Sequence, residues 1–267
     1  MQHLRVLYSD EVLIVFEKPA GVSVHPSERA IRQGEKRTET DVIRILRAQT
    51  GRSVYPVHRL DRATHGVMVM AFDGKTAGLL QQQFKQGEVQ KRYLLMCRGW
   101  LQDSGRIEEP LESDSEQEPV VFQDAVTDFH TLFRFEIPVS SGKHSSSRFS
   151  VVQASPRTGR FHQIRRHFKK ISHPLIGDSM HGDGRQNRIW REILQDKRLF
   201  LMAWTIGFRH PRTQECMKFR ARFAKFWHPV FDRAGVCPVE TLNQETWSQE
   251  TMVPVEVVDA ASATSSF

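Results

Sequence analysis

One stretch of the sequence places a carboxylate among basic side chains at the entrance to an apolar run. Residues 57–66 read Val-His-Arg-Leu-Asp-Arg-Ala-Thr-His-Gly, and a run rich in Val and Met continues to Phe72. The run predicts a buried strand that begins at Gly66. The neighbouring cations favour the ionised form of Asp61. An ionised carboxylate at the mouth of a rigid strand can act as a nucleophile or a base, although structural ion pairs have the same composition.

A second stretch, residues 156–171, combines an apolar helical pattern with a basic stripe. Its apolar residues recur at 3-4-3 spacing, which predicts the buried seam of one helix: Phe161, Ile164, Phe168 and Ile171. His162, Arg165 and Lys169 form an adjacent stripe that borders the core. Arg165 can therefore reach inward to a buried carboxylate. A basic surface helix would have the same pattern.

These residues must be positioned by strands and helices elsewhere in the chain. The pattern of expected strands and helices indicates an α+β fold with a mixed, largely antiparallel sheet and flanking helices. The strand signals are a hairpin over residues 4–16, the run after Gly66, and the segments 90–99, 147–152, 199–208 and 217–223. Alternation over 90–99 places Tyr93, Leu95 and Cys97 on one face. Core packing alone is sufficient to explain a tyrosine at that position.

The helix and loop signals complete the fold. A short helix is expected over 41–47, capped near Thr38 or Thr40 and ended by Gly51, and a second helix from Asp73 to Gly87. Residues 27–40 are polar and predict a loop. Residues 102–128 are acidic, which predicts an exposed, irregular insertion that lies away from any anionic ligand.

Composition favours one domain and a cytoplasmic protein. The chain has 267 residues, of which 39% are hydrophobic, and no apolar run approaches the roughly 20 residues of a membrane helix. No apolar segment resembling a secretory signal follows Met1. Three scattered cysteines give neither a disulfide framework nor a zinc signature. We expect a domain over 1–239 and a loosely ordered tail over 240–267.

The charge is unevenly distributed. The formal net charge is +7, and because the tail from Glu240 carries five acids and no Lys or Arg, residues 1–239 carry +12. Residues 137–177 contain eight Lys or Arg and no acidic residue. A basic body with one strongly basic segment suits a polyanion such as nucleic acid, although an uneven surface charge is also common in proteins that bind none.

Four motifs occur in one order along the chain. They are Lys18-Pro-Ala-Gly21, His58-Arg-Leu-Asp61 with Thr64 and Gly66, Lys91-Arg-Tyr93, and Gly159-Arg-Phe-His-Gln-Ile-Arg165. Together they resemble the RNA pseudouridine synthases, specifically the RluA family typified by ribosomal-large-subunit synthase A. The resemblance covers residues 4 to 225. The family usually has Ser at position 65, a residue other than Phe at 161 and His at 202, where this chain has His65, Phe161 and Met202.

The resemblance implies specific roles. Asp61 is the catalytic carboxylate, Arg165 pairs with it, and Tyr93 stacks on the target uracil. Arg59 fills the gap that the extruded uridine leaves. Basic residues around these motifs are expected to bind RNA phosphates: Arg59, Arg62, Arg160, His162, Arg166, Lys169 and Lys170. Isomerising uridine exchanges no electron and loses no atom, so no cofactor is expected.

The substrate follows from narrower features. Residues 173–183 resemble a loop that closes the family's cleft, and Gly184-Arg-Gln-Asn-Arg188 resembles the subgroup that modifies tRNA at position 65, in the T-stem. The small RNA-binding domain that precedes the first motif in some relatives is not expected here. We therefore expect tRNA as the partner, with ribosomal RNA as the alternative, and neither a membrane nor an obligate protein partner.

Two other function classes use the same residues. A metal-dependent phosphohydrolase would draw its ligands from His58, Asp61, His173, Asp178, His181 and Asp183, although no compact metal-binding spacing occurs. A non-catalytic RNA-binding module would need only the basic face. Such a module has no use for Asp61, because an exposed carboxylate repels phosphate.

Overall fold

The computed structural model describes residues 3–25, 41–113, 121–142 and 144–237. The loop expected over 27–40 and the tail expected from 240 lie outside these ranges. Within them, no helix is long and apolar enough to cross a membrane.

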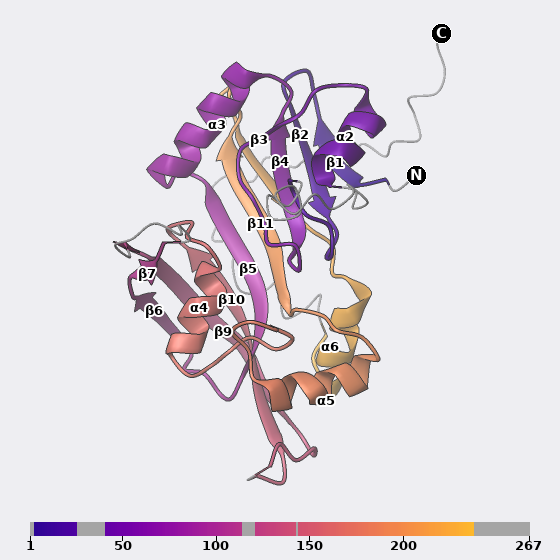
Figure 1. Cartoon of the computed structure of the whole chain (residues 1–267), viewed down its shortest axis with the longest axis vertical. Coiled ribbons are helices and arrows are strands. Elements are labelled where there is room, and N and C mark those ends of the chain that lie inside the picture. The colour runs from indigo at the N-terminus through magenta and orange to yellow at the C-terminus, as the bar shows by residue number, and fades with distance from the viewer. Residues whose placement is uncertain (1–2, 26–40, 114–120, 143, 238–267) are drawn as a thin grey trace, which may run out of the picture.

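A ten-stranded sheet forms the body of the molecule (Figure 1). Its strands lie in the order β1-β2-β4-β11-β5-β10-β9-β6, with β12 paired to β11 and β3 to β4. All of these pairs are antiparallel except β4 with β11. The bounds are β1 Arg5–Ser9, β2 Leu13–Lys18, β3 Tyr55–Pro56, β4 His65–Ala71, β5 Gln90–Arg98, β6 Ser104–Glu108, β9 Val126–Ile137, β10 Ser147–Pro156, β11 Leu201–Arg209 and β12 Cys216–Arg220. The expected fold class is confirmed.

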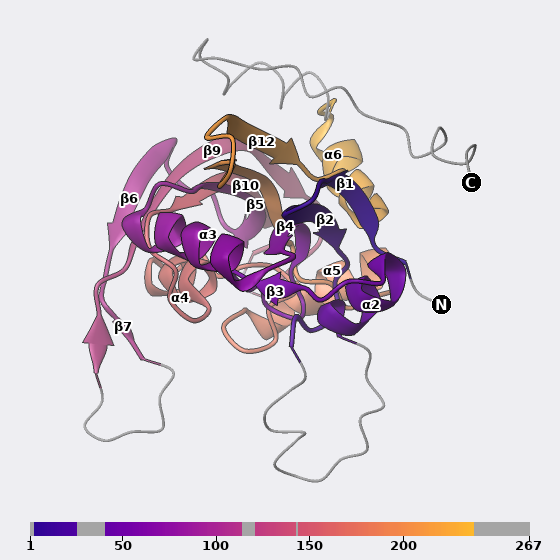
Figure 2. The same ribbon diagram turned by 90° about the horizontal axis from the view of Figure 1, so that it is seen from above.

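Five helices of the described chain flank the sheet: α2 Val42–Thr50, α3 Gly74–Gln86, α4 Gln163–Lys170, α5 Gly184–Leu194 and α6 His228–Ala234, with a 3₁₀ turn η1 at Lys225–Trp227. Helices α2 and α4 lie on one side of the sheet and α6 on the other (Figure 2). The two-residue side-chain period of a strand explains this division. Ile14 and Phe16 of β2 pack with α2, whereas Leu13 and Val15 belong to the cluster that includes the apolar residues of α6.

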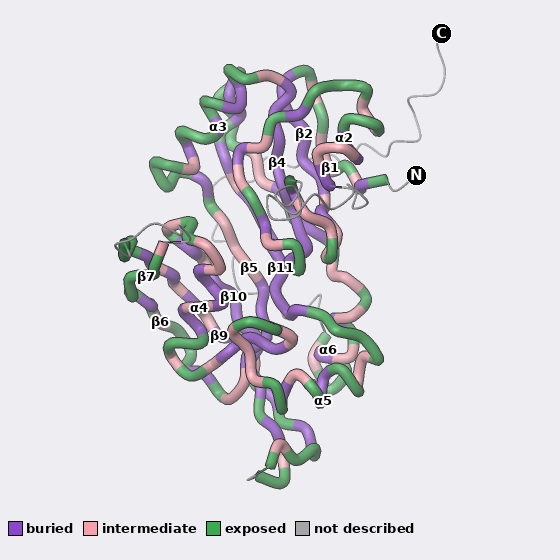
Figure 3. The backbone as a smooth tube through the Cα atoms, viewed as in Figure 1, coloured by how far each residue is buried: buried purple, intermediate pink, exposed green. Residues whose placement is uncertain are grey.

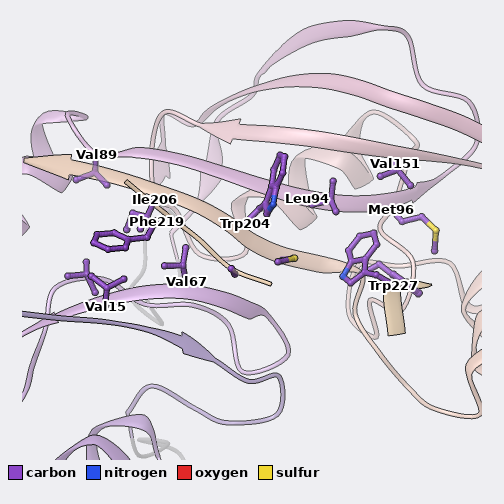
Figure 4. Close-up of a cluster of buried hydrophobic side chains, with 14 of the residues drawn as sticks. Val15, Val67, Val89, Leu94, Met96, Val151, Trp204, Ile206, Phe219 and Trp227 are labelled. Atoms are coloured by element: carbon purple, nitrogen blue, oxygen red, sulfur yellow. The ribbon is translucent and has the colours of Figure 1, made fainter. Parts of the chain in front are cut away.

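The central strands are buried along their length. All seven residues of β4 are buried, as the purple tube in Figure 3 shows. The larger apolar cluster joins Val67 of β4 and Leu94 and Met96 of β5 to Trp204 of β11 and Trp227 (Figure 4). Dense packing of this kind holds the strand ends, and the loops attached to them, in fixed positions.

Gly66 is required where β4 meets β11. Its φ is +133°, and a Cβ there would lie 2.2 Å from the Ala203 carbonyl oxygen. Only glycine lacks that atom and adopts such a φ freely. The parallel pairing of Ala203 with Gly66 therefore depends on this residue.

Several boundaries differ from the expectations. The cap of α2 is Asp41, whose side chain accepts a hydrogen bond from the Arg44 N–H at 2.9 Å, rather than Thr38 or Thr40. Helix α4 begins only at Gln163, because the φ of His162 is +50°, which lies outside the right-handed helical range. Phe161 therefore lies before the helix. Helices α5 and α6 were not expected.

The described parts of the acidic segment, residues 102–113 and 121–128, are not irregular. They contribute β6, the start of β9 and a small two-stranded sheet of β7 (Leu111–Glu112) and β8 (Phe122–Gln123). Ile107, Leu111 and Ala125 are buried, because apolar residues alternate with the acids and provide an inward face. The segment also contacts α4, since His167 Nε2 lies 3.0 Å from the Glu109 carbonyl oxygen.

Candidate active site

The site forms where β11 separates β4 from β5. Ala203 of β11 is the register partner of Gly66 on one side and of Tyr93 on the other. Adjacent strands lie about 4.8 Å apart, so this pairing brings the loop before β4 close to Tyr93. A cleft of about 900 Å³ opens there and is lined by Asp61, Tyr93 and Arg165, among other residues.

Arg165 connects two carboxylates. Its Nη1 donates to Asp61 Oδ2 at 2.9 Å, while Nε and Nη2 donate to the two oxygens of Asp178 at 2.7 and 2.8 Å. The side chain of Asp178 is fully buried and that of Asp61 is 22% exposed. Burial by itself would raise the pKa of Asp178, but hydrogen bonds from Arg165 and from backbone N–H groups lower it overall. Asp178 therefore orients Arg165, which orients the accessible Asp61. The expected salt bridge between Arg165 and Asp61 is confirmed.

The loop that carries Asp61 is braced from the N-terminal hairpin. Lys18 is buried, and its Nζ donates to the carbonyl oxygens of Pro19, Val22 and Arg62. The Gly21 N–H also donates to the Arg62 carbonyl at 2.7 Å. Burial lowers the pKa of Lys18 to about 7. The Lys-Pro-Ala-Gly turn thus fixes the backbone next to Asp61.

Tyr93 faces the same cleft as Asp61, as expected. Its position on β5 follows from the pairing of that strand with both β11 and β10. Burial, followed by the charge of Asp61, raises the pKa of the Tyr93 hydroxyl above its ordinary value. The hydroxyl therefore remains protonated near neutral pH. A planar ring with a protonated hydroxyl can pack on a base and donate a hydrogen bond.

Two histidines approach the same carboxylate. His162 Nε2 lies 3.7 Å from Asp61 Oδ2, and His162 Nδ1 lies 3.1 Å from His181 Nε2. The His162 ring stacks on Phe161 with centroids 3.7 Å apart. Burial lowers the pKa of His162 to about 4 and also lowers that of His181. Both rings are neutral near pH 7, so one nitrogen donates and the other accepts.

The residues expected to bind RNA fall into two groups. Arg59, Arg160 and His162 line the cleft. The others do not line it: Arg62, Arg166, Lys169 and Lys170. Arg62 Nε donates to the Gly21 carbonyl, Arg166 Nη1 to that of Glu112, and Lys170 Nζ to that of Pro110. The acidic insertion was expected to lie away from the RNA-binding face, but its backbone accepts hydrogen bonds from three of the seven residues, Arg160, Arg166 and Lys170. Their contact with RNA stays a prediction.

The six candidate metal ligands have other partners. His58 Nε2 accepts a hydrogen bond from the Val69 N–H and its ring stacks on Phe84. Asp183 caps α5 and pairs with Arg98 at 2.6 Å. Among the described residues, no group of three or more His, Cys, Asp or Glu side chains could hold a metal ion.

Sequence reasoning missed three contributors to this site. Asp178 was considered only as a metal ligand and as a member of the cleft-closing loop 173–183, and Lys18 only as part of a motif. Lys91 lines the cleft, donates to the Thr158 carbonyl at 3.1 Å, and has its pKa lowered to about 8 by burial. The Lys-Arg-Tyr motif was the available signal for it. Two departures from the family pattern also meet in the structure, because His65 and Met202 are register partners.

The geometry agrees with comparisons to known proteins. The sequence profile of the RNA pseudouridylate synthase family matches residues 12–170. The chain is 38% identical over 238 residues to tRNA pseudouridine synthase C of Haemophilus ducreyi, covering 87% of this chain and 96% of that protein. It is 40% identical over 232 residues to tRNA pseudouridine synthase C of Pasteurella multocida, covering 84% and 93%.

Solved structures show the same fold. Human RNA pseudouridylate synthase domain containing 4 superposes with a TM-score of 0.64 at 21% identity, covering 86% of this chain and 93% of that one. Human RNA pseudouridylate synthase domain containing 1 gives 0.63 at 22% identity, covering 83% and 84%. The family profile spans the carboxylate loop, the tyrosine strand and the arginine helix that form the cleft. The chain belongs to the RNA pseudouridylate synthase family and is an isomerase that converts uridine to pseudouridine in RNA.

Proposed function

We propose that this enzyme modifies tRNA, at uridine 65 of the T-stem, and that Asp61 carries out the chemistry. The observation that carries the catalytic assignment is the Asp61–Arg165–Asp178 arrangement beside Tyr93 in one cleft. The substrate assignment is supported by relatives named tRNA pseudouridine synthase C and by the motif at 184–188. Ribosomal RNA is the alternative substrate. A cytoplasmic location and RNA as the macromolecular partner belong to the same proposal.

The reaction moves one bond within the nucleotide. The bond from C1′ to N1 breaks, the base turns, and C5 joins C1′, while the C5 proton leaves and N1 gains one. Asp61 either attacks covalently or abstracts a proton from the sugar. In both routes Arg165 holds the carboxylate toward the sugar and stabilises its charge. Tyr93 packs on the uracil and has a protonated hydroxyl available for proton transfer.

A uridine inside a stem must leave its stack before it can react. Extrusion costs a few kcal/mol and is favoured when a side chain occupies the gap. Arg59 is exposed and lines the cleft next to Asp61, so we assign this role to it. Arg160 and His162 lie across the cleft and are available to contact the flanking phosphates.

The test combines substrate mapping with one substitution. Cells lacking the protein should lose one pseudouridine in tRNA, and the purified enzyme should restore it. Asp61→Asn keeps the shape and removes the charge, so it should abolish pseudouridine formation without weakening RNA binding. A binding-only module would instead tolerate Asp61→Asn. Loss of an rRNA pseudouridine with intact tRNA would replace the tRNA assignment by the ribosomal one.

A further inference from the structure

A second pocket lies outside the catalytic cleft. It has a volume of about 430 Å³ and is lined by residues from the end of β5, the loop before β10, the start of β10, and the cap and first turn of α5. Its lining is entirely polar or glycine and includes three arginines: Arg98, Arg148 and Arg185. No lining residue is shared with the cleft. The pocket therefore has the composition of an anion site.

Gln186 lines the pocket but does not form part of the anion site. The residue is 5% exposed, and its Oε1, which has no hydrogen-bond partner, is itself buried from solvent. A ligand in the pocket therefore does not reach this oxygen, and the case for an anion rests on the arginines.

The three arginines differ in how they are held. Arg148 Nε pairs with Glu136 at 3.1 Å, and its guanidinium lies 4.2 Å from the centre of the Trp100 ring. Arg98 pairs with Asp183 at 2.6 Å. Contacts on one side of a guanidinium fix its direction and leave other N–H groups for a ligand. Arg185 is exposed and follows the capping residue of α5 by two positions.

The pocket is connected to the catalytic residues through a short segment. Asn187, next to Gln186, accepts from the Gly177 N–H at 2.6 Å and donates to the Asp178 carbonyl at 2.8 Å. Asp178 in turn binds Arg165. Asp183 of the pocket lies five positions after Asp178 in the sequence, so their Cα atoms lie within about 18 Å. At about 3.4 Å per nucleotide along a strand, one RNA can reach both sites.

We propose that this pocket binds the sugar–phosphate backbone of the same RNA, a few nucleotides from the target uridine. Arg148 and Arg185 hold a phosphate. The inference rests on the proposed function, since it assumes an RNA in the cleft. It gives the motif at 184–188 two roles, because Asn187 supports the loop that carries Asp178 while Arg185 binds RNA.

The test measures RNA affinity separately from the rate at saturating enzyme. Arg148→Ala and Arg185→Ala should each weaken tRNA binding about tenfold, and each should reduce the slope of log Kd against log salt concentration by about one, as expected for a lost phosphate contact. The loss should appear in Kd rather than in the saturated single-turnover rate. Arg191→Ala is the matched control, because Arg191 is an exposed arginine of the same helix that does not line the pocket. Losses equal to those of Arg191→Ala would overturn the proposal.

The two proposals fail separately: a wild type that binds tRNA through this pocket but forms no pseudouridine in it would refute only the substrate assignment.

Discussion

At the scale of single residues, the site depends on one guanidinium shared between two carboxylates. Arg165 uses one edge to bind the buried Asp178 and the remaining nitrogen to hold Asp61. A planar fork can make these contacts together, whereas an ammonium group cannot. The proposed chemistry therefore predicts that arginine is needed at this position and that a positive charge alone is not enough.

Arg165→Lys should test that requirement. We expect the single-turnover rate to fall at least about a hundredfold, because the misdirected carboxylate loses its orientation. Binding of RNA should change by less than about threefold, since the charge is retained. Arg166→Lys is the control, because Arg166 does not line the cleft. A rate within a factor of a few of the wild type would show that Arg165 supplies charge only.

Arg59→Ala should separate extrusion from chemistry. The variant should react slowly when the target uridine is paired, because the gap left by the base is not filled. The defect should shrink when the uridine is presented unpaired, because the few kcal/mol of unstacking are then already absent. Single-turnover kinetics on paired and unpaired versions of one RNA measure both. Equal defects on the two RNAs would assign Arg59 to another step.

At the scale of elements, the active site is assembled by the insertion of β11 between β4 and β5. This crossing depends on Gly66, where any side chain would overlap the Ala203 backbone. Lys18 then fixes the loop that leads into β4. The loop that carries Asp61 is thus held by a strand pairing on one side and by a buried lysine on the other.

Gly66→Ala should destabilise the fold strongly. The added Cβ would lie 2.2 Å from a backbone oxygen at a positive φ, so the strands must separate. We expect a loss of about 3 kcal/mol or more in the free energy of unfolding, measured by urea denaturation. Gly78→Ala on α3 is the control, since its Cβ would meet nothing within 4 Å. That change should stabilise by about 0.5–1 kcal/mol. Similar stabilities for the two variants would refute the close approach.

At the scale of the whole molecule, buried histidines link stability to acid. Burial lowers the pKa of His58 to about 3 and that of His65 to about 4. Below pH 6.5 these histidines become protonated in the unfolded chain first, so unfolding is favoured as pH falls. The stability they contribute is complete above about pH 6.5 and is lost progressively toward pH 4.

His65→Phe should reduce this acid sensitivity. The ring keeps its edge contact with Phe226, and two unpartnered buried nitrogens are removed. When the pH falls from 7 to 4.5, the free energy of unfolding should decrease less in the variant than in the wild type. The difference should be up to about 1.4 kcal/mol for each unit by which the His65 pKa differs between the folded and unfolded chains. Urea midpoints across this range measure the difference in slope, independently of any constant packing cost. Parallel profiles would show that His65 does not titrate on unfolding.

The sequence alone determined the residue types of the site and most of the elements. A continuous apolar run predicted the strand around Val67, and period-two alternation predicted the strand around Leu94. Apolar spacing of three to four residues predicted the helices ended by Gly51 and Gly87. These signals are local, since side-chain period and capping depend on a few neighbouring residues. The pairing of Arg165 with Asp61 was also anticipated, because four motifs together indicated one family.

Tertiary structure determines the long-range contacts of the site, which local sequence patterns do not encode. The role of Asp178 as the second partner of Arg165 depends on a loop fixed by Asn187, and no spacing in the sequence shows this. The acidic residues near 109 lie against the basic helix α4 because β6 pairs with β9, and Glu109 then pairs with Lys170 at 3.4 Å. The placement of Tyr93 beside Asp61 required β11, more than a hundred residues later, to pair with both strands. Long-range pairing is selected by the burial of whole faces, so it emerges only when the complete sheet forms.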